Sequence, residues 1–285
     1  MIKWLSFIIA LVLCVGVFSG FLGRFHPLGD SLSLLRLPLG VGCVLLVIAS
    51  PSRSQRLVCA MAAVAAGVTT VPLFFAGAPN GDLTLYSKNV WYRNSQLDAL
   101  AQDMRASGAE VITLQEVSHR NRMWLTGLAD IYPHQHLCRN AGWSGIAVLS
   151  KHPIRKTRCS SRRAVAAAQI ARDGQAIWVV SIHLAWAYPY GHETALQSAL
   201  AVLDGLTGPV VIGGDFNVFP WASSVGALTA ATATQLAGPL RPTYWLKGVP
   251  LPLDHAYSPG GGQVTYQPEL GSDHQGVLAR LRIFP

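Results

Sequence analysis

The chain has 285 residues, a formal net charge of +8, and a charged fraction of only 13%. This length excludes a protein too small to bury a core, and the uneven distribution of charge excludes a uniformly apolar chain. Residues 1–80 carry very few charges, whereas residues 81–285 have the size and composition of one globular domain with a modest positive charge.

Two long uncharged runs in the first 80 residues are each long enough to cross a bilayer as a helix. They are Trp4–Gly23 and Leu57–Ala78, and a shorter apolar run, Leu37–Ser50, lies between them. The shorter run can span if Arg36 and Arg53 reach back toward the headgroups. We therefore predict a membrane anchor over 1–80 with about three transmembrane helices, near 2–22, 33–50 and 57–78. The alternative for the first run is a cleaved signal peptide, although no clear cleavage site follows it.

Positive charges flanking these runs favour one orientation weakly. Lys3 and the pair Arg53 and Arg56 fall on one side of a three-span anchor, and Arg24 and Arg36 on the other. By the positive-inside rule, the N-terminus is cytoplasmic and the C-terminal domain is extracytoplasmic. In a bacterium this predicts an inner-membrane protein with a periplasmic domain.

The cysteines divide between the two regions. Cys14, Cys43 and Cys59 lie in the apolar runs, and Cys138 and Cys159 are the two in the C-terminal domain. A disulfide between Cys138 and Cys159 suits an oxidising compartment, and two free thiols are the alternative.

Short apolar and alternating segments predict the elements of the domain. In chain order, strands are expected at 82–89, 110–116, 134–138, 145–149, 165–170, 176–184, 209–213, 254–257, 263–266 and 276–283. Helices are expected at 95–107, opened by a capping box at Ser95, and at 118–128, 192–206 and 220–229, the last with Pro220 in its first turn. Strands outnumber helices, which favours an α/β domain with two sheets packed face to face and helices outside.

Polar side chains gather at the ends of these strands. They are Asn89, Glu116, His183, Asp215, Asn217, Asp254, Asp273 and His274. Burying such groups is costly unless they are paired or bind a metal, so we expect one convergent site. Carboxylate and amide oxygens suit Mg²⁺ or Mn²⁺, and imidazoles transfer protons, which together indicate metal-assisted hydrolysis of a phosphoester.

Six short stretches resemble the endonuclease/exonuclease/phosphatase superfamily, which includes deoxyribonuclease I-like nucleases and neutral sphingomyelinases. The stretches are Tyr86–Asn89, Leu114–Glu116, Ser181–Leu184, Gly213–Asn217, Leu253–His255 and Gly271–His274, in order over residues 82–285. The resemblance implies a four-layer α/β/β/α sandwich of two mixed sheets and a catalytic domain at 81–285.

The resemblance also implies a role for each residue. Glu116 would be the main metal ligand, assisted by Asn89 and Asp273 directly or through water. Asp215 would orient or deprotonate the attacking water, and Asn217 and His183 would contact the phosphate. His274 would contact the phosphate or move a proton, held by Asp254. His255 alternates to the other face and is expected to be structural.

Three further patterns allow other interpretations. His134, His136 and Cys138 share a strand face and suit zinc, although no fourth ligand is evident. A basic run can face an anion or simply be solvated; it comprises Lys151, Arg155, Lys156, Arg158, Arg162 and Arg163. Aromatic residues near the site motifs are candidates for substrate binding: Trp143, Trp186, Tyr188, Trp221, Tyr244 and Trp245.

The sequence thus favours a membrane-tethered, Mg²⁺- or Mn²⁺-dependent phosphoesterase acting on a phosphodiester or phosphomonoester, with a lipid or lipid-linked substrate preferred. A membrane-anchored nuclease acting on DNA or RNA is the main alternative. A non-catalytic binding module on the same fold is the third hypothesis. No protein partner is predicted.

Overall fold

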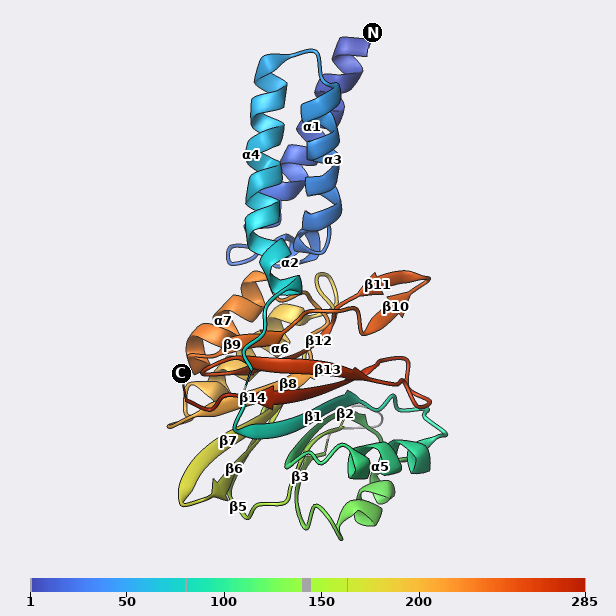
Figure 1. Cartoon of the computed structure of the whole chain (residues 1–285), viewed down its shortest axis with the longest axis vertical. Helices are drawn as coiled ribbons and strands as arrows, with labels where there is room; N and C mark the ends of the chain where they lie inside the picture. Colours follow the sequence, from blue (N-terminus) through green and yellow to red (C-terminus); the bar gives the residue numbers. More distant parts are fainter. Residues whose placement is uncertain (1, 80, 140–144, 163, 285) are drawn as a thin grey trace.

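The computed structural model describes residues 2–79, 81–139, 145–162 and 164–284, and it divides into a helical bundle and a sheet domain (Figure 1). The bundle stands at one end of the sheet domain, with the N-terminus at its far tip. Its long helices are α1 (Ile2–Ser19), α3 (Arg36–Ala49) and α4 (Arg53–Thr70). A short helix α2 (Leu28–Ser33) and a 3₁₀ turn η1 (Val71–Phe74) lie at the junction with the sheet domain.

Small side chains fill the interior of the bundle. Ala62, Ala66 and Cys43 are buried, and a Cβ on Gly40 would come within 2.7 Å of the Ala66 Cβ. Large apolar side chains face outward instead, including Ile48 at 75% exposed and Val68 at 65%. By length and composition, Arg53–Phe74, with a mean hydropathy of 2.1, is the one described helical segment able to cross a membrane; Lys3–Ser19 and Arg36–Ala49 are apolar but shorter.

The helix bounds differ from the predicted ones near the middle run. The predicted helix at 33–50 is divided, because residues 28–33 form the separate helix α2 and α3 begins only at Arg36. The expectation that Arg36 reaches outward is wrong: its side chain is buried. Its two terminal guanidinium nitrogens donate to the carbonyls of Gly20 at 2.6 Å and Trp221 at 3.2 Å, whereas its buried Nε has no hydrogen-bond partner among the described residues.

The sheet domain is built around a mixed sheet of twelve strands. In sheet order they are β3 (His134–Cys138), β4 (Gly145–Ser150), β2 (Val111–Val117), β1 (Leu83–Asn89), β14 (Gly276–Leu281), β13 (Gly262–Gln267), β9 (Gln235–Gly238), β12 (Asp254–Ser258), β8 (Val210–Asp215), β7 (Gln175–His183), β6 (Val165–Arg172) and β5 (Ile154–Cys159). A separate hairpin consists of β10 (Tyr244–Leu246) and β11 (Val249–Leu251).

The sheet folds back on itself, so that its two halves enclose an apolar core. Leu85 and Val111 from one half pack in the same cluster as Val179 and Val211 from the other. The prediction of an α/β fold with mixed sheets is confirmed. The two predicted sheets are one, because β9 pairs with β12 in one half and with β13 in the other.

Helices cover the two outer faces. Helix α5 (Leu97–Ala106) and the 3₁₀ segment η2 (Arg122–Leu128) pack outside the β1–β2 half. Helices α6 (His192–Leu203) and α7 (Ser223–Thr232) pack outside the β7–β8 half. The capping box predicted at Ser95 is absent: α5 begins at Leu97, and the Asn94 side chain accepts a bond from the Gln96 N–H at 2.7 Å. Helix α7 begins at Ser223, so Pro220, predicted to lie in its first turn, precedes the helix.

Candidate active site

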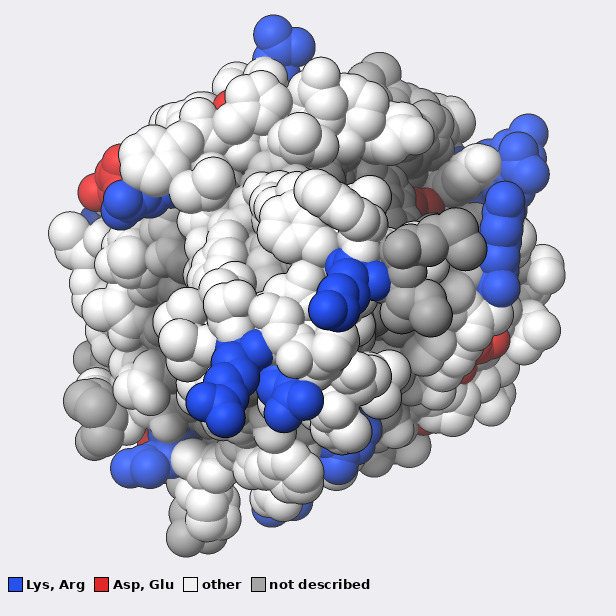
Figure 2. All heavy atoms as spheres, turned by 90° about the horizontal axis from the view of Figure 1, so that it is seen from above, with Lys and Arg blue, Asp and Glu red and all other residues white. Residues whose placement is uncertain are grey.

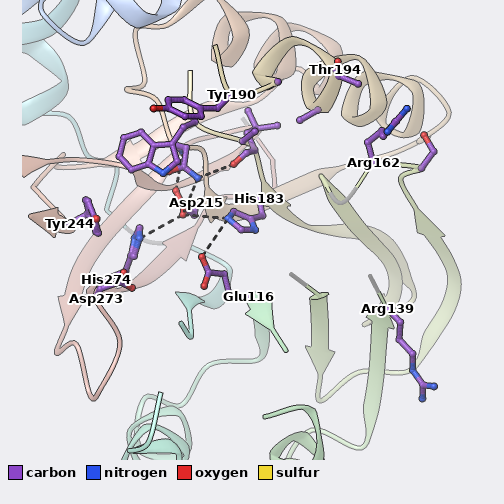
Figure 3. Close-up of a pocket in the computed structure, with 17 residues that line it drawn as sticks. Glu116, Arg139, Arg162, His183, Tyr190, Thr194, Asp215, Tyr244, Asp273 and His274 are labelled. Atoms are coloured by element: carbon purple, nitrogen blue, oxygen red, sulfur yellow. Dashed lines mark hydrogen bonds and ion pairs between the residues drawn. The ribbon is translucent and has the colours of Figure 1, made fainter. Parts of the chain in front are cut away.

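Strand register brings the predicted polar residues to one edge of the folded sheet. His183 and Asp215 are partners where β7 pairs in parallel with β8, and Asp254 is the partner of Asp215 in the antiparallel pairing of β12 with β8. Asn89 and Glu116 end β1 and β2, which run parallel in the facing half. Segments spread over nearly two hundred residues therefore supply one site (Figure 3).

Asn89 links the carboxylates of the two halves. Its amide nitrogen donates to Asp215 at 3.0 Å and to Glu116 at 3.3 Å. Its amide oxygen accepts the Trp91 N–H at 3.0 Å. In this arrangement the Asn89 amide nitrogen orients Glu116 and Asp215, and its role as an assisting metal ligand, directly or through water, stays a prediction.

His274 and Asp254 form the predicted carboxylate–histidine pair. The Nδ1 of His274 lies 2.7 Å from an Asp254 oxygen, and its Nε2 lies 3.7 Å from Asp215. Burial alone lowers the pKa of His274, but the charges of Asp254 and Asp215 and the bond to Asp254 outweigh it and raise this pKa to about 10. His274 is therefore a cation at neutral pH.

Asp215 lies at the centre of the site. Burial raises its pKa to about 6, opposed by the charges of His274 and His183. The Asn217 backbone N–H donates to one Asp215 oxygen at 3.0 Å, and the Asn217 amide donates to the Leu184 carbonyl at 2.8 Å. A carboxylate with a pKa this close to neutrality is suited to accept a proton.

His183 lies between the two halves. Its Nε2 is 3.8 Å from Asp215 and 4.0 Å from Glu116. Burial lowers the pKa of His183, and the nearby His274 lowers it further, whereas Asp215 raises it. It is therefore a neutral hydrogen-bonding group beside a cationic one.

The donor set around Glu116 fits a hard divalent cation. Burial raises the pKa of Glu116, and the charge of Asp273 adds to this effect. Within the described residues, no lysine or arginine forms an ion pair with Glu116 or Asp215. A cation held by Glu116 and Asp273 would offset this negative charge. Asp215, Asp254 and His274 also bring ligand atoms within 4.8 Å of one another, but the 2.7 Å bond between Asp254 and His274 already engages that group.

Lys88 is a buried residue next to the site that sequence reasoning left without a role. Its fully buried ammonium donates to the carbonyls of Pro268, Glu269 and His274 at 3.0, 2.8 and 2.6 Å. Burial lowers the pKa of Lys88 to about 8, although the charges of nearby carboxylates such as Asp254 raise it. Lys88 thereby fixes the loop before His274. The sequence feature that could have indicated this role is a lysine within a largely buried strand.

A pocket of about 930 Å³ opens above these residues. Trp186 and Tyr244, two predicted substrate-binding residues, line it together with Tyr190. The Tyr244 ring lies 4.7 Å from the His274 ring and 6.0 Å from the Trp186 ring. Arg139 and Arg162 also line the pocket, away from the carboxylates (Figure 3).

The other aromatic candidates lie elsewhere. Trp221 donates its indole N–H to the Ser33 carbonyl at 2.8 Å, and Tyr188 accepts a bond from Ser31 at 3.1 Å, so both contact the base of the helical bundle. Trp245 is in the exposed β10–β11 hairpin and does not line the pocket. Trp143 falls outside the described residues.

Cys138 and Cys159 are joined by a disulfide, with their Cα atoms 5.6 Å apart. The bond engages both sulfurs, so Cys138 offers no thiolate for the alternative zinc site. The Nε2 of His136 lies 3.1 Å from the Arg158 carbonyl. Three residues of the basic run, Arg155, Lys156 and Arg158, lie in the exposed edge strand β5, at the end of the domain far from the bundle (Figure 1). Arg162 instead lines the pocket, and Arg163 falls outside the described residues. His255 is buried and stacks on Phe216, in line with a structural role.

The site is thus a cluster of carboxylates and histidines at one edge of a folded mixed sheet. A family model described as the Endonuclease/Exonuclease/phosphatase family matches residues 86–274, and the chain belongs to this family. Members of the family are metal-dependent phosphoester hydrolases.

Among curated proteins, the chain is similar to a UPF0294 protein of Vibrio cholerae, with 35% identity over 125 residues. The match covers 39% of this chain and 42% of that protein, so the chain spans less than half of this relative.

Several solved structures share the fold. An endonuclease/exonuclease/phosphatase family protein from Leptotrichia buccalis has a TM-score of 0.56 and 16% identity, covering 70% of this chain and 99% of the other. Danio rerio TDP2 complexed with a single-strand DNA product has a TM-score of 0.56 and 17% identity, covering 69% and 97%. Staphylococcus aureus beta toxin with bound magnesium ions has a TM-score of 0.51 and 16% identity, covering 70% and 100%.

Proposed function

We propose that this protein is a membrane-tethered phosphoesterase that uses a divalent metal to hydrolyse a phosphodiester or phosphomonoester of a lipid or lipid-linked substrate. The observation that carries the hydrolase assignment is the convergence of Glu116, Asp215 and His274 on one pocket from separate strands. The location of the pocket beside the bundle supports a substrate at the bilayer.

Glu116 and Asp273 would hold the metal, Mg²⁺ or Mn²⁺, which supplies charge neutralisation at the phosphoryl oxygens and lowers the pKa of water. Asp215 accepts the proton of the attacking water. His274, kept cationic and oriented by Asp254, donates to the phosphoryl group. His183 and Asn217 add neutral hydrogen bonds to the same group.

The outward apolar faces of the bundle support the tether. Lys3 lies at the start of α1, and Arg53 and Arg56 lie at the start of α4, and both helices begin at the far tip of the bundle (Figure 1). Lys and Arg side chains are visible in the middle of the view onto that end (Figure 2). This distribution favours an inner membrane with the N-terminus cytoplasmic and the catalytic domain periplasmic. The disulfide is compatible with that oxidising compartment.

An activity panel with the full chain in detergent tests this proposal. With Mg²⁺ or Mn²⁺ we expect hydrolysis of phospholipid vesicles and of the soluble probe bis(4-nitrophenyl) phosphate, and loss of both on adding EDTA. Glu116→Gln should lose activity while keeping its thermal unfolding curve. Glu193→Gln, at an exposed carboxylate on α6 that pairs with Gln197, is the control and should be unaffected. EDTA-resistant hydrolysis would contradict the metal assignment.

A nuclease is the second candidate, supported by the exposed basic strand β5, which faces away from the bundle. In the same panel a nuclease would degrade DNA or RNA, with an activity that falls steeply as salt rises, and would leave vesicles intact. Tight binding of a phosphoester without turnover would favour the third candidate, a binding module.

A further inference from the structure

A buried acidic residue of the N-terminal region caps a helix of the catalytic domain. Asp30, 3% exposed, accepts the backbone N–H of Ser223 at 2.7 Å and that of Ser224 at 3.0 Å. These are the first residues of α7, which has no side-chain cap from its own neighbouring residues. A carboxylate at this position satisfies unpaired N–H groups and the positive end of the helix dipole.

Ser224 connects Asp30 to a histidine near the pocket. The Ser224 hydroxyl lies 2.9 Å from Nε2 of His192, which is buried at the start of α6. Nδ1 of His192 lies 2.6 Å from the Ala185 carbonyl. Because a carbonyl oxygen only accepts, Nδ1 carries a proton and donates it. Ala185 lines the pocket directly after His183 and Leu184.

A second contact reaches the other part of the same loop. Ser31 donates to the Tyr188 carbonyl at 3.1 Å, and the His26 ring lies 5.5 Å from the Tyr188 ring. The loop 184–191, defined here as the pocket loop, is therefore held from two sides by residues 26–31. It carries Trp186 and Tyr190, which form a wall of the pocket.

The contacting segment is itself anchored. Arg36 donates to the carbonyl of Trp221 at 3.2 Å, and the indole N–H of Trp221 donates to the carbonyl of Ser33 at 2.8 Å. Arg36 also lies 3.8 Å above the Phe21 ring. These contacts fix residues 31–36 against the sheet domain.

We propose that residues 26–36 are a positioning element of the active site, in which Asp30 acts through Ser224 and His192 to fix the pocket loop for substrate binding. The helical region then positions the pocket loop in addition to serving as a tether. The kinetic readout of this inference rests on the proposed phosphoesterase function, and the exchange readout below does not.

A soluble substrate separates positioning from tethering. With bis(4-nitrophenyl) phosphate and the full chain in detergent, Asp30→Ala should raise KM about tenfold, because a lost bond to a charged group is worth roughly that factor. The kcat and its pH profile should change less than twofold, because Asp30 contacts none of Glu116, Asp215 and His274. Asp30→Asn, which is isosteric, should show a smaller effect and serves if Asp30→Ala does not fold. Asp204→Ala, at an exposed residue after α6, is the control.

His192 variants test the route. His192→Phe removes both bonds and should raise KM at least as much as Asp30→Ala. His192→Asn keeps a donor near the position of Nδ1 and should recover most of the wild-type KM. If Asp30 acts through His192, the double variant Asp30→Ala/His192→Phe should be no worse than His192→Phe alone. Additive effects on KM, or an unchanged KM in Asp30→Ala, would overturn the proposal.

Hydrogen exchange provides a readout without activity. In Asp30→Ala, amides of residues 184–191 should exchange about tenfold faster, and those of β2 should be unchanged. Unchanged exchange in the pocket loop would overturn the inference even in an active enzyme. A wild-type chain inactive on every phosphoester would instead refute the proposed function and leave the exchange result standing.

Discussion

The helical bundle and the sheet domain arrange the same apolar residue types in opposite ways. In the bundle, Ala62 and Ala66 are inside, and Val64 and Val68 are more than 60% exposed. In the sheet domain, Leu, Ile and Val fill the core, and the exposed strand β5 is basic. The difference indicates two surroundings: water around the sheet domain and, as we propose, lipid around the bundle, where small residues pack helices together.

The buried polar groups divide differently. The buried lysine and aspartates of the sheet domain, Lys88, Asp215 and Asp254, lie at the site, whereas the buried charges of the bundle, Asp30 and Arg36, lie at its base. The boundary between the bundle and the sheet domain therefore contains buried polar contacts, and three changes, two in the sheet domain and one in the bundle, test the comparison.

The largest effect is expected inside the sheet domain. His274→Ala should reduce kcat on bis(4-nitrophenyl) phosphate by about 10² to 10⁴-fold, because the change removes the cation that faces the phosphoryl group. His119→Ala, at an exposed histidine, should leave kcat unchanged. Equal kinetics in the two variants would show that the polar convergence is not the reacting centre.

A charge on the outward face of the bundle tests the lipid side. Val64→Lys should weaken partition of the chain into vesicles by about 2.5 to 3.5 kcal/mol if Val64 faces the bilayer core. The matched change Thr157→Lys, on the exposed strand β5, should not alter partition. Co-flotation with vesicles measures both, and equal flotation of Val64→Lys and wild type would place the bundle outside the bilayer.

The smallest effect is a pH dependence within the sheet domain. Burial lowers the pKa of His255 from 6.5 to about 4, so between these values the unfolded chain binds a proton that the folded chain does not. Stability from this group is therefore present above pH 6.5 and lost as pH falls, by about 2.5 kcal/mol from pH 7 to 4.5. Denaturant titration of wild type against His255→Gln isolates the effect. A variant with the same pH slope as wild type would assign the slope to other groups.

Much of the site followed from local patterns. Asn89, Glu116, His183 and Asp215 end apolar strands, and strand ends are visible in the sequence because buried strands are apolar over short, uninterrupted stretches. Lys88 shows the limit of this reasoning. It stands in the same motif, but its role depends on carbonyls nearly two hundred residues away.

The aromatic residues near the site motifs also show this limit, because only some of them line the pocket. Sequence proximity to site motifs predicted six pocket residues, yet Trp221 and Tyr188 contact residues 31–36, and Trp186 and Tyr244 line the pocket. Neighbouring positions along a loop point in different directions, so their contacts depend on what packs against the loop.

By itself, the sequence determined an α/β domain, its strand ends, its family motifs and an apolar N-terminal region, because apolar periodicity and polar strand ends are encoded over a few consecutive residues. The tertiary structure decided that one sheet replaces two, that Arg36 is buried, and that Asp30 caps α7. These depend on long-range contacts in which a buried charge is stable only where distant backbone groups satisfy it.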